Sequence, residues 1–398
     1  MADAEPITWR QAIDMKEWKE AMIEELRSIE RNRTWNLVEL PQHKRAIEVK
    51  WIFKTKYKPS GEIAKLKARL VANGFLQQQG VDYTDVYAPV ARLETVRLVV
   101  VVAVFSSWRI QQLDVKSAFL NGPLEEEVYV RQPPGFEKKG EEQKVYRLNK
   151  ALYGLKQAPR AWNNHINALL LKLGFWKSSV EFGIYVKITE LQNKLLVGLY
   201  VDDLLVTGDS EEEIDVFKER MKEEFDMTDL GKLNHFLGFE FVETANGVIL
   251  HQKRYINEVL KRFNMSNCNN VPIPITANLK LADQPEEERV DASLYNQIVG
   301  SLRYICNSKP DISYGVGLLS RFMNEPRTSH MAAAKHVLRY LKGTSSYGLL
   351  FPKDSRSMKG ILEVWCDSDW TGDKVDRRST FGYFIRYEGA PISWCSKK

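Results

Sequence analysis

The sequence has little cysteine and no long apolar run. Its four cysteines, at positions 268, 306, 366 and 395, have no paired spacing, so the sequence indicates neither a disulfide framework nor a zinc site. We therefore expect a reducing, intracellular setting. No stretch approaches the ~18 apolar residues that a membrane span needs, and the acidic residues 1–5 do not resemble a signal peptide. Membrane proteins and disulfide-stabilised secreted proteins are thereby excluded.

A strong net charge is also lacking, since 57 Lys and Arg face 52 Asp and Glu and leave a formal charge of +5. The distribution is more informative, because residues 44–69 hold nine of the cations and only two acids. Basic and apolar residues alternate over 49–57 and 64–72, on either side of Pro59-Ser60-Gly61, which predicts a hairpin with one basic face. Such a face is either a solvated lysine surface or a phosphate-binding clamp.

The length of 398 residues, with 44% hydrophobic and 27% charged residues, is typical of a globular protein of two or three subdomains. Apolar periodicity predicts a helix or helix pair over residues 8–31, with Asp14 and Glu17 as a capping box and Trp18, Met22 and Ile29 on one face. Further helices are predicted over 95–105, over a segment that residues 152–162 open, and over 210–225, 252–263, 292–306 and 328–343.

Two acidic stretches indicate chemistry. Asp202 and Asp203 lie between the apolar runs 195–197 and 204–206, which predicts two buried strands that meet at an acidic turn, the second ending at Gly208. Asp-Asp at a turn is either solvated or paired with a divalent cation, since buried carboxylates need a partner. Asp114 ends another strand, over 110–114. The three carboxylates are expected to converge on adjacent strands and to bind Mg²⁺.

The segments Leu113-Asp114-Val115-Lys116-Ser117-Ala118-Phe119 and Tyr200-Val201-Asp202-Asp203 resemble the two metal-binding motifs of copia-type retrotransposon reverse transcriptases. The resemblance covers nearly the whole chain. It implies an α+β, right-hand polymerase fold with fingers, palm and thumb, followed by a connection and a truncated RNase H-like segment. It also implies that Asp114, Asp202 and Asp203 are catalytic and hold two Mg²⁺ ions, for which Mn²⁺ can substitute.

The same resemblance assigns the nucleotide site. Lys67-Ala68-Arg69-Leu70-Val71 matches the fingers signature, so Lys67 and Arg69 bind the triphosphate, with Lys56 as a weaker third candidate. Phe119 is expected to be the steric gate against ribose. Tyr153, Gly154 and Lys156 belong to a motif that holds the templating base and nucleotide; many reverse transcriptases have Gln where this chain has Tyr153. Lys232, in a loop expected over 230–232, resembles the lysine that protonates pyrophosphate, and residues 235–241 resemble the primer grip.

The resemblance also predicts domain boundaries and an incomplete nuclease. The parts are an N-terminal helical lead-in over 1–43, fingers and palm over 44–245, thumb and linker over 246–290, a connection over 291–350 and the RNase H-like domain over 351–398. Asp367 is its first, vestigial metal ligand. The family's later catalytic residues have no counterpart before Lys398, so no RNase H activity is expected. We also expect an uncovered apolar face to leave residues 361–395 poorly stable.

The function that follows is RNA-directed DNA synthesis, with transfer of a nucleotide from dNTP to a primer 3′-OH on an RNA or DNA template. The expected partners are template-primer and dNTPs, with no membrane, and the expected location is the cytoplasm, in a virus-like particle, or the nucleus. A decayed or domesticated copy that binds nucleic acid without catalysis is an alternative. A cyclase is a further alternative, but it would need no fingers, thumb or primer grip. Element activity, natural primer, oligomeric state and membership of a longer polyprotein are left open.

Overall fold

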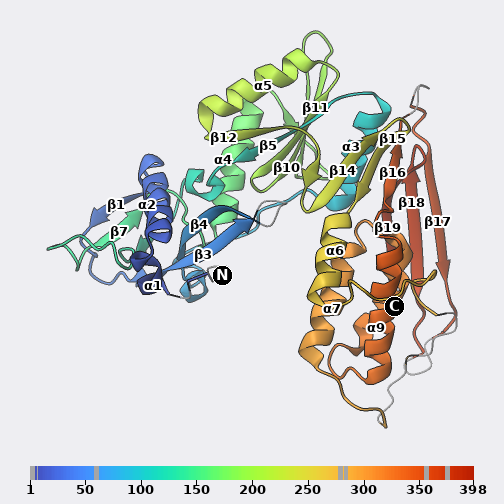
Figure 1. Cartoon of the computed structure of the whole chain (residues 1–398). Helices are drawn as coiled ribbons and strands as arrows, with labels where there is room; N and C mark the ends of the chain where they lie inside the picture. Colours follow the sequence, from blue (N-terminus) through green and yellow to red (C-terminus); the bar gives the residue numbers. More distant parts are fainter. Residues whose placement is uncertain are drawn as a thin grey trace. The chain divides into compact units, whose positions relative to one another are not determined.

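The computed structural model describes residues 5–6, 8–57, 62–276, 281, 286–353, 358–372 and 377–398, and has the mixed helix and strand content that the sequence predicts. The chain forms two compact units, each built from several segments (Figure 1). The first comprises Met1–Ala91, Leu113–Leu204 and Glu212–Asp229. The second comprises Arg92–Gln112, Leu205–Glu211 and Leu230–Lys398. The five predicted domain boundaries stay a prediction.

The first unit begins with the predicted helix pair, α1 (Trp9–Asp14) and α2 (Lys16–Arg31). The predicted capping box is wrong. The box is formed by Thr8 and Gln11 at the start of α1, and Met15 has an extended backbone that ends one helix and precedes the next. Asp14 is therefore the last residue of α1, one residue too early to be the N-cap of α2.

Helix α2 packs against the basic hairpin, which consists of β3 (Val49–Tyr57) and β4 (Ile63–Ala72). In the antiparallel register Lys54 is opposite Lys67, and Lys56 is opposite Lys65. Directly opposed side chains point to the same face, so the predicted basic face is confirmed. The other face holds Trp51, Phe53, Ala68 and Leu70 in the core of this unit. The predicted turn at Pro59-Ser60-Gly61 lies outside the described residues.

A six-stranded sheet carries the acidic motifs. Its strand order is β12 (Met227–Lys232), β5 (Ile110–Val115), β11 (Asp203–Gly208), β10 (Lys194–Tyr200), β9 (Ile184–Ile188) and β8 (Trp176–Lys177). The strand that ends near Asp114 is thus a direct neighbour of the strand that follows Asp202, as predicted. Leu204, Leu205 and Val206 are fully buried, which explains the continuous apolar run after the acidic pair.

The remaining elements of the first unit complete its core. They are a sheet of β1 (Trp35–Val38), β7 (Val145–Leu148), β6 (Tyr129–Val130) and β2 (Ala46–Ile47), the 3₁₀ turns η1 (Gly74–Leu76) and η2 (Ala118–Asn121), and the helices α4 (Ala158–Lys172) and α5 (Glu211–Glu224). The indole of Trp162 on α4 meets Phe225, just after α5, edge-on with ring centroids 5.1 Å apart. Helix α5 begins and ends within one residue of the predicted range 210–225.

The second unit combines helices with two antiparallel sheets (Figure 1). Its helices are α3 (Leu93–Phe105), α6 (Lys253–Arg262), α7 (Ala292–Ile305), α8 (Ser313–Leu319) and α9 (Thr328–Gly343), with 3₁₀ turns η3 (Pro310–Ile312) and η4 (Ser320–Phe322). One sheet has the order β13 (His235–Phe236), β14 (Phe239–Thr244), β15 (Gly247–His251) and β16 (Leu349–Pro352). The other has β17 (Leu362–Ser368), β18 (Phe381–Tyr387) and β19 (Ala390–Lys397). No helix of the described ranges is long and apolar enough to span a bilayer.

One buried cation ties the C-terminal sheet to the apolar helix α3. Arg97 is only 3% exposed; its Nε donates to the carbonyl of Ile392 at 2.7 Å, and a terminal nitrogen donates to the carbonyl of Asn307 at 3.1 Å. The guanidinium lies 4.2 Å from the ring centroid of Trp394, whose Nε1 donates to the carbonyl of Cys306 at 2.9 Å. Burial lowers the pKa of Arg97 to about 10.

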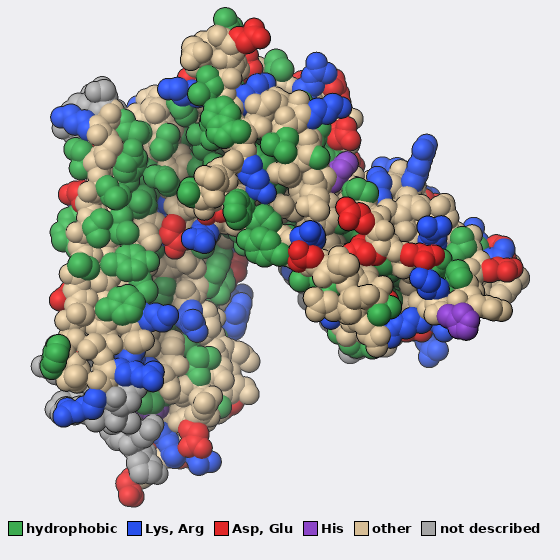
Figure 2. All heavy atoms as spheres, turned by 180° about the vertical axis from the view of Figure 1, so that it is seen from behind, with side chains coloured by type: hydrophobic (Ala, Val, Ile, Leu, Met, Phe, Trp, Pro, Cys, Tyr) green, Lys and Arg blue, Asp and Glu red, His purple; other side chains and the backbone are tan. Residues whose placement is uncertain are grey.

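Strand β17, at the opposite edge of this sheet, is exposed along most of its length. Leu362, Val364 and Trp365 are 58%, 56% and 48% exposed. Hydrophobic side chains also gather on the surface of the second unit in Figure 2. The expected instability of residues 361–395 stays a prediction. Within this sheet β17 is the exposed strand, whereas β19 is bonded to the buried Arg97.

Replacing Arg97 with methionine should loosen β19. The change removes the buried guanidinium and its two hydrogen bonds, and it leaves the carbonyls of Ile392 and Asn307 without these donors. We therefore expect the free energy of local opening to fall by roughly 2–4 kcal/mol. Amide hydrogen exchange over 390–397 measures this. The control Arg109→Met removes an ion pair with Glu211 in which both side chains are 62% exposed, and it should change protection by less than ~1 kcal/mol. Equal protection in both variants would contradict the anchoring role.

Candidate active site

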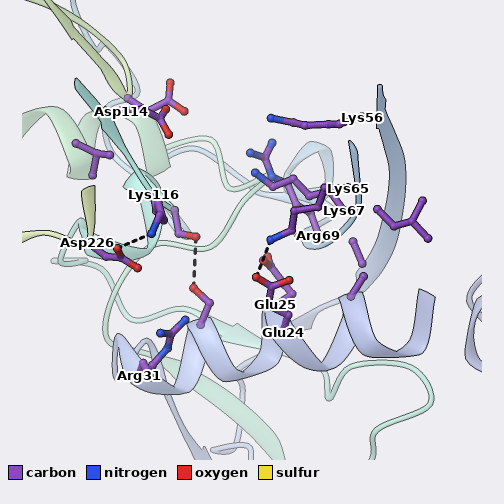
Figure 3. Close-up of a pocket in the computed structure, with 17 residues that line it drawn as sticks. Glu24, Glu25, Arg31, Lys56, Lys65, Lys67, Arg69, Asp114, Lys116 and Asp226 are labelled. Atoms are coloured by element: carbon purple, nitrogen blue, oxygen red, sulfur yellow. Dashed lines mark hydrogen bonds and ion pairs between the residues drawn. The ribbon is translucent and has the colours of Figure 1, made fainter. Parts of the chain in front are cut away.

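A polar cavity of about 210 Å³ lies within the first unit (Figure 3). Helix α2 and strand β4 form one wall, and the segment after β5 forms another. The lining includes acidic and basic side chains from distant parts of the sequence: Glu24, Glu25, Arg31, Lys56, Lys65, Lys67, Arg69, Asp114, Lys116, Asp202 and Asp226. Five of the residues predicted from sequence, Lys56, Lys67, Arg69, Asp114 and Asp202, are thus brought together.

Asp114 and Asp202 reach the cavity from neighbouring strands. Asp114 is the penultimate residue of β5, and Asp202 lies in the turn between β10 and β11. The backbone N–H of Val115 donates to the carbonyl of Asp202 at 2.9 Å, which holds the two motifs side by side. Val201 has a φ of 57°, so the acidic turn contains a residue in the left-handed backbone conformation, which β-branched residues seldom adopt.

The two carboxylates influence each other. Burial raises the pKa of Asp114, and the negative charge of Asp202 raises it further, while Lys67 and Lys56 act in the opposite direction. A divalent cation would relieve this repulsion, and carboxylate oxygens are the ligands that Mg²⁺ prefers. The donor chemistry of Asp114 and Asp202 therefore fits such an ion.

The third predicted ligand differs in position. Asp203 begins β11 and is not among the residues that line the cavity. Asp202 belongs to the turn and Asp203 to the strand, so the two neighbouring carboxylates have different backbone positions. Within the described part of the chain, no group of three or more His, Cys, Asp or Glu is arranged to hold a metal ion. The role of Asp203 stays a prediction.

The cations of the cavity come mainly from the basic hairpin. Lys67 and Arg69 project from β4, together with Lys65, and Lys56 projects from β3 (Figure 3). Partial burial lowers the pKa of Lys67, and the neighbouring charges of Arg69 and Lys56 lower it further. These groups repel one another in the absence of an anion, so their arrangement suits a ligand with several negative charges.

Three of the predicted nucleotide-binding residues contact one another in a cluster. The guanidinium of Arg69 lies 4.5 Å from the ring centroid of Tyr153, and the ring of Tyr153 lies 5.5 Å from that of Phe119 on η2. Burial raises the pKa of Tyr153 to about 12, so its hydroxyl stays protonated at neutral pH. Tyr153 thus connects the basic strand with the aromatic residue that follows Asp114.

Gly154 makes this cluster geometrically feasible. Its φ is +88°, and a Cβ atom added there would lie 2.2 Å from the carbonyl oxygen of Ala72. The amide of Ala72 donates to the carbonyl of Tyr153 at 2.7 Å. Only glycine combines this backbone conformation with so close an approach, so the Tyr153-Gly154 turn is fastened to the end of β4.

Lys156 contacts two residues of the segment that follows β4. Its Nζ lies 3.2 Å from the hydroxyl of Tyr83 and 3.4 Å from the carbonyl oxygen of Gln77, and its amide donates to the side chain of Gln77. It is not among the cavity-lining residues. Its role with nucleotide stays a prediction.

Two other predicted residues belong to the second unit. Lys232 was expected in a loop, but it ends strand β12 and forms an ion pair with Glu243. The loop assignment is therefore wrong, and its role with pyrophosphate stays a prediction. Asp367 lies on exposed β17 and accepts from the amide of Ser368 at 2.9 Å. The predicted primer-grip segment forms the hairpin of β13 and β14, with left-handed Leu237 and Gly238 at its turn.

The contribution of α2 to the cavity was not predicted from the sequence, because the apolar face of this helix indicates packing alone. Glu24 pairs with Lys65 at 2.7 Å, and Glu25 is buried beside β4. One signal was present in the sequence: Glu25 follows Met22 by three residues and precedes Ile29 by four, so it lies on the apolar face. Lys116 and Asp226, which pair at 2.8 Å, were also missed, because nothing local links positions so far apart.

Comparison with known proteins agrees with this geometry. Residues 32–277 match the family described as "Reverse transcriptase (RNA-dependent DNA polymerase)", and the chain belongs to this family. Within the family it is of the copia type of retrotransposon. It is 40% identical, over its whole length, to the retrovirus-related Pol polyprotein from transposon RE1 of Arabidopsis thaliana.

Two further relatives support the same class. The polyprotein from transposon TNT 1-94 of Nicotiana tabacum is 38% identical over 99% of this chain. The putative transposon Ty5-1 protein of Saccharomyces cerevisiae is 38% identical over 72% of this chain and 92% of its own length. The chain spans only 27% of the RE1 polyprotein and 30% of the TNT 1-94 polyprotein.

Proposed function

We propose that this chain catalyses RNA-directed DNA synthesis, adding deoxynucleotides from dNTPs to a primer 3′-OH on an RNA or DNA template. The observation that carries the proposal is the shared cavity of Asp114, Asp202, Lys67 and Arg69. It combines carboxylates for a cation with cations for a polyphosphate, which are the two requirements of nucleotidyl transfer.

The carboxylates of Asp114 and Asp202 would hold Mg²⁺, and Asp203 is the candidate for a third ligand. When bound, a pair of such ions supplies activation of the attacking hydroxyl and stabilisation of the leaving pyrophosphate. The fixed neighbourhood of β5 and β11 keeps the two carboxylates together, so the site needs little rearrangement to accept cations.

Lys67 and Arg69 would bind the triphosphate. Arg69 is held over the ring of Tyr153, which limits the rotation of its guanidinium. Lys67 is partly buried between Arg69 and Lys56, so an anion near it gains from all three charges. Lys156 is the remaining candidate of the nucleotide motif.

Phe119 would discriminate against ribonucleotides. It follows Asp114 by five residues, and its ring packs against Tyr153 next to the basic strand. An aromatic ring in this place crowds a ribose 2′-OH if the sugar lies between the carboxylates and the triphosphate site. In the proposed architecture, β3 and β4 are the fingers, the six-stranded sheet is the palm, β13 and β14 are the primer grip, and α6 belongs to the thumb.

Primer extension on poly(rA)/oligo(dT) with Mg²⁺ and dTTP tests the proposal. We expect extension of the primer by the intact chain, and no extension when a chelator removes the divalent cation. Binding of template-primer without extension would favour the alternative of a decayed or domesticated copy. A chain that neither binds nor extends the substrate would contradict the polymerase assignment, and a cyclase would then need to be tested.

A further inference from the structure

One carboxyl of the cavity occupies a position that favours an apolar side chain. Glu25 lies on the buried face of α2 with Trp18, Met22 and Ile29, and it is 7% exposed. A buried carboxylate is unfavourable unless cations or hydrogen-bond donors compensate it. A leucine would fit the same stripe without this penalty, so the presence of glutamate needs a reason beyond packing.

The surroundings of Glu25 compensate its charge only in part. Its Oε1 accepts a long hydrogen bond, 3.4 Å, from the amide of Leu70 on β4. The charged groups that face it are Lys67 and Arg69 on β4 and Glu24 on its own helix (Figure 3). The phenol of Tyr153 lies in the same neighbourhood. Burial raises the pKa of Glu25 to about 7, against the opposing effects of Leu70, Arg69 and Lys67.

The cations that face Glu25 are the ones assigned to the triphosphate. A carboxylate and a triphosphate cannot both be neutralised by Lys67 and Arg69, because the second anion experiences the charge of the first. An incoming triphosphate therefore favours the protonated form of Glu25. By linkage, protonation of Glu25 favours the triphosphate to the same extent.

We propose that Glu25 is a proton-coupled counter-ion of the nucleotide site: it neutralises Lys67 and Arg69 in the absence of nucleotide and takes up a proton when the triphosphate binds. The inference rests on the proposed function, because it assumes that these two cations receive the triphosphate. The proton comes from solvent and forms the O–H bond of the Glu25 carboxyl, and no other covalent bond changes. Glu25 is thus a positioning residue that acts through its neighbours.

Calorimetry can measure the proton directly. The chain is loaded with poly(rA)/oligo(dT) whose primer ends in a dideoxynucleotide, and Mg²⁺-dTTP is titrated at pH 7 in two buffers of different ionisation enthalpy. Because Glu25 is about half ionised at this pH, we expect it to take up roughly half a proton for each nucleotide that binds. Glu25→Gln should lack this contribution. Subtracting the proton uptake of this variant from that of the wild type cancels the protons that the nucleotide itself exchanges.

The matched control is Glu24→Gln, on the neighbouring residue. Glu24 also faces the basic strand, but it is exposed and paired with Lys65, so this variant should retain the proton uptake. Affinity supplies a second readout. The affinity of the wild type for dTTP should fall as pH rises from 6 to 8, whereas the affinity of Glu25→Gln should stay nearly constant. At pH 8 the variant should therefore bind dTTP about tenfold more tightly than the wild type.

A second variant separates this role from a structural one. Glu25→Leu restores the apolar stripe and should fold with a higher denaturation midpoint at pH 8 than the wild type, yet show the same loss of proton uptake. Nucleotide binding with equal uptake in wild type and Glu25→Gln would overturn the inference and leave the proposed function standing. Loss of uptake in Glu24→Gln alone would also overturn it. No nucleotide binding by any variant would overturn the proposed function, and the inference with it.

Discussion

Replacing Asp114 or Asp202 with asparagine is expected to reduce primer extension by about a thousandfold or more, which corresponds to ~4 kcal/mol of transition-state stabilisation. Both carboxylates line the cavity, and the charge of Asp202 already acts on Asp114. Asparagine keeps the shape of the side chain and removes the negative charge that a divalent cation requires. Binding of template-primer should change little, because its phosphates are attracted by cations that these substitutions leave in place.

The matched control for these two variants is an Asp→Asn substitution outside the cavity. Asp215 on α5 is 73% exposed and pairs with Lys218 of the same helix, so Asp215→Asn should extend primers at nearly the wild-type rate. Single-turnover extension and filter binding, measured on the same preparations, separate chemistry from substrate binding. Near-normal extension by Asp202→Asn would be incompatible with the site described here.

Replacing Gly154 with alanine is expected to destabilise the first unit by several kcal/mol. The new methyl group would lie 2.2 Å from the carbonyl oxygen of Ala72 and 2.5 Å from Cγ1 of Val71, and the backbone conformation at φ +88° is itself strained for alanine. Since Tyr153 is fastened to Ala72 and contacts Arg69, relief of this clash would also move the nucleotide-binding cluster. We therefore expect a raised KM for dNTP in any folded fraction.

Gly80 provides the matched control for backbone strain. Its φ is +81°, almost the same as that of Gly154, but no atom lies within 4 Å of the position of an added Cβ. Gly80→Ala should therefore lower the free energy of unfolding only by the cost of the left-handed conformation, about 1 kcal/mol, and should leave nucleotide affinity unchanged. Denaturation midpoints of the two variants measure the difference. Equal destabilisation would show that the close approach to Ala72 has no energetic role.

Much of the fold was predictable from local patterns. The alternation of lysines with Trp51 and Phe53 specified the basic hairpin, and the apolar runs beside Asp202 specified two buried strands. Such patterns are reliable because a strand or helix must bury one face, and its period is visible in a few residues. The neighbourhood of Asp114 and Asp202 was predictable because a strand that ends in a carboxylate and an acidic hairpin fit one sheet.

Other features depended on contacts between segments that are distant in the sequence. Met15 interrupts the helical pattern that placed a capping box at Asp14, and Lys156 is held by Gln77 and Tyr83. Arg97 is stabilised by carbonyl groups about 210 and 295 residues away along the chain. No window of sequence contains both partners of such contacts, so their free energy does not appear in a local pattern.

By itself, the sequence determined most of the longer helices, the basic hairpin, the strands beside the acidic turn and the residue types of the proposed site. Only the tertiary structure decided that α2 joins this site, that Asp202 and not Asp203 lines the cavity, and that Glu25 is buried facing Lys67 and Arg69. The physical reason is that periodicity reports whether a side chain is buried, whereas the charge state and chemical role of a buried side chain depend on the neighbours that folding brings to it.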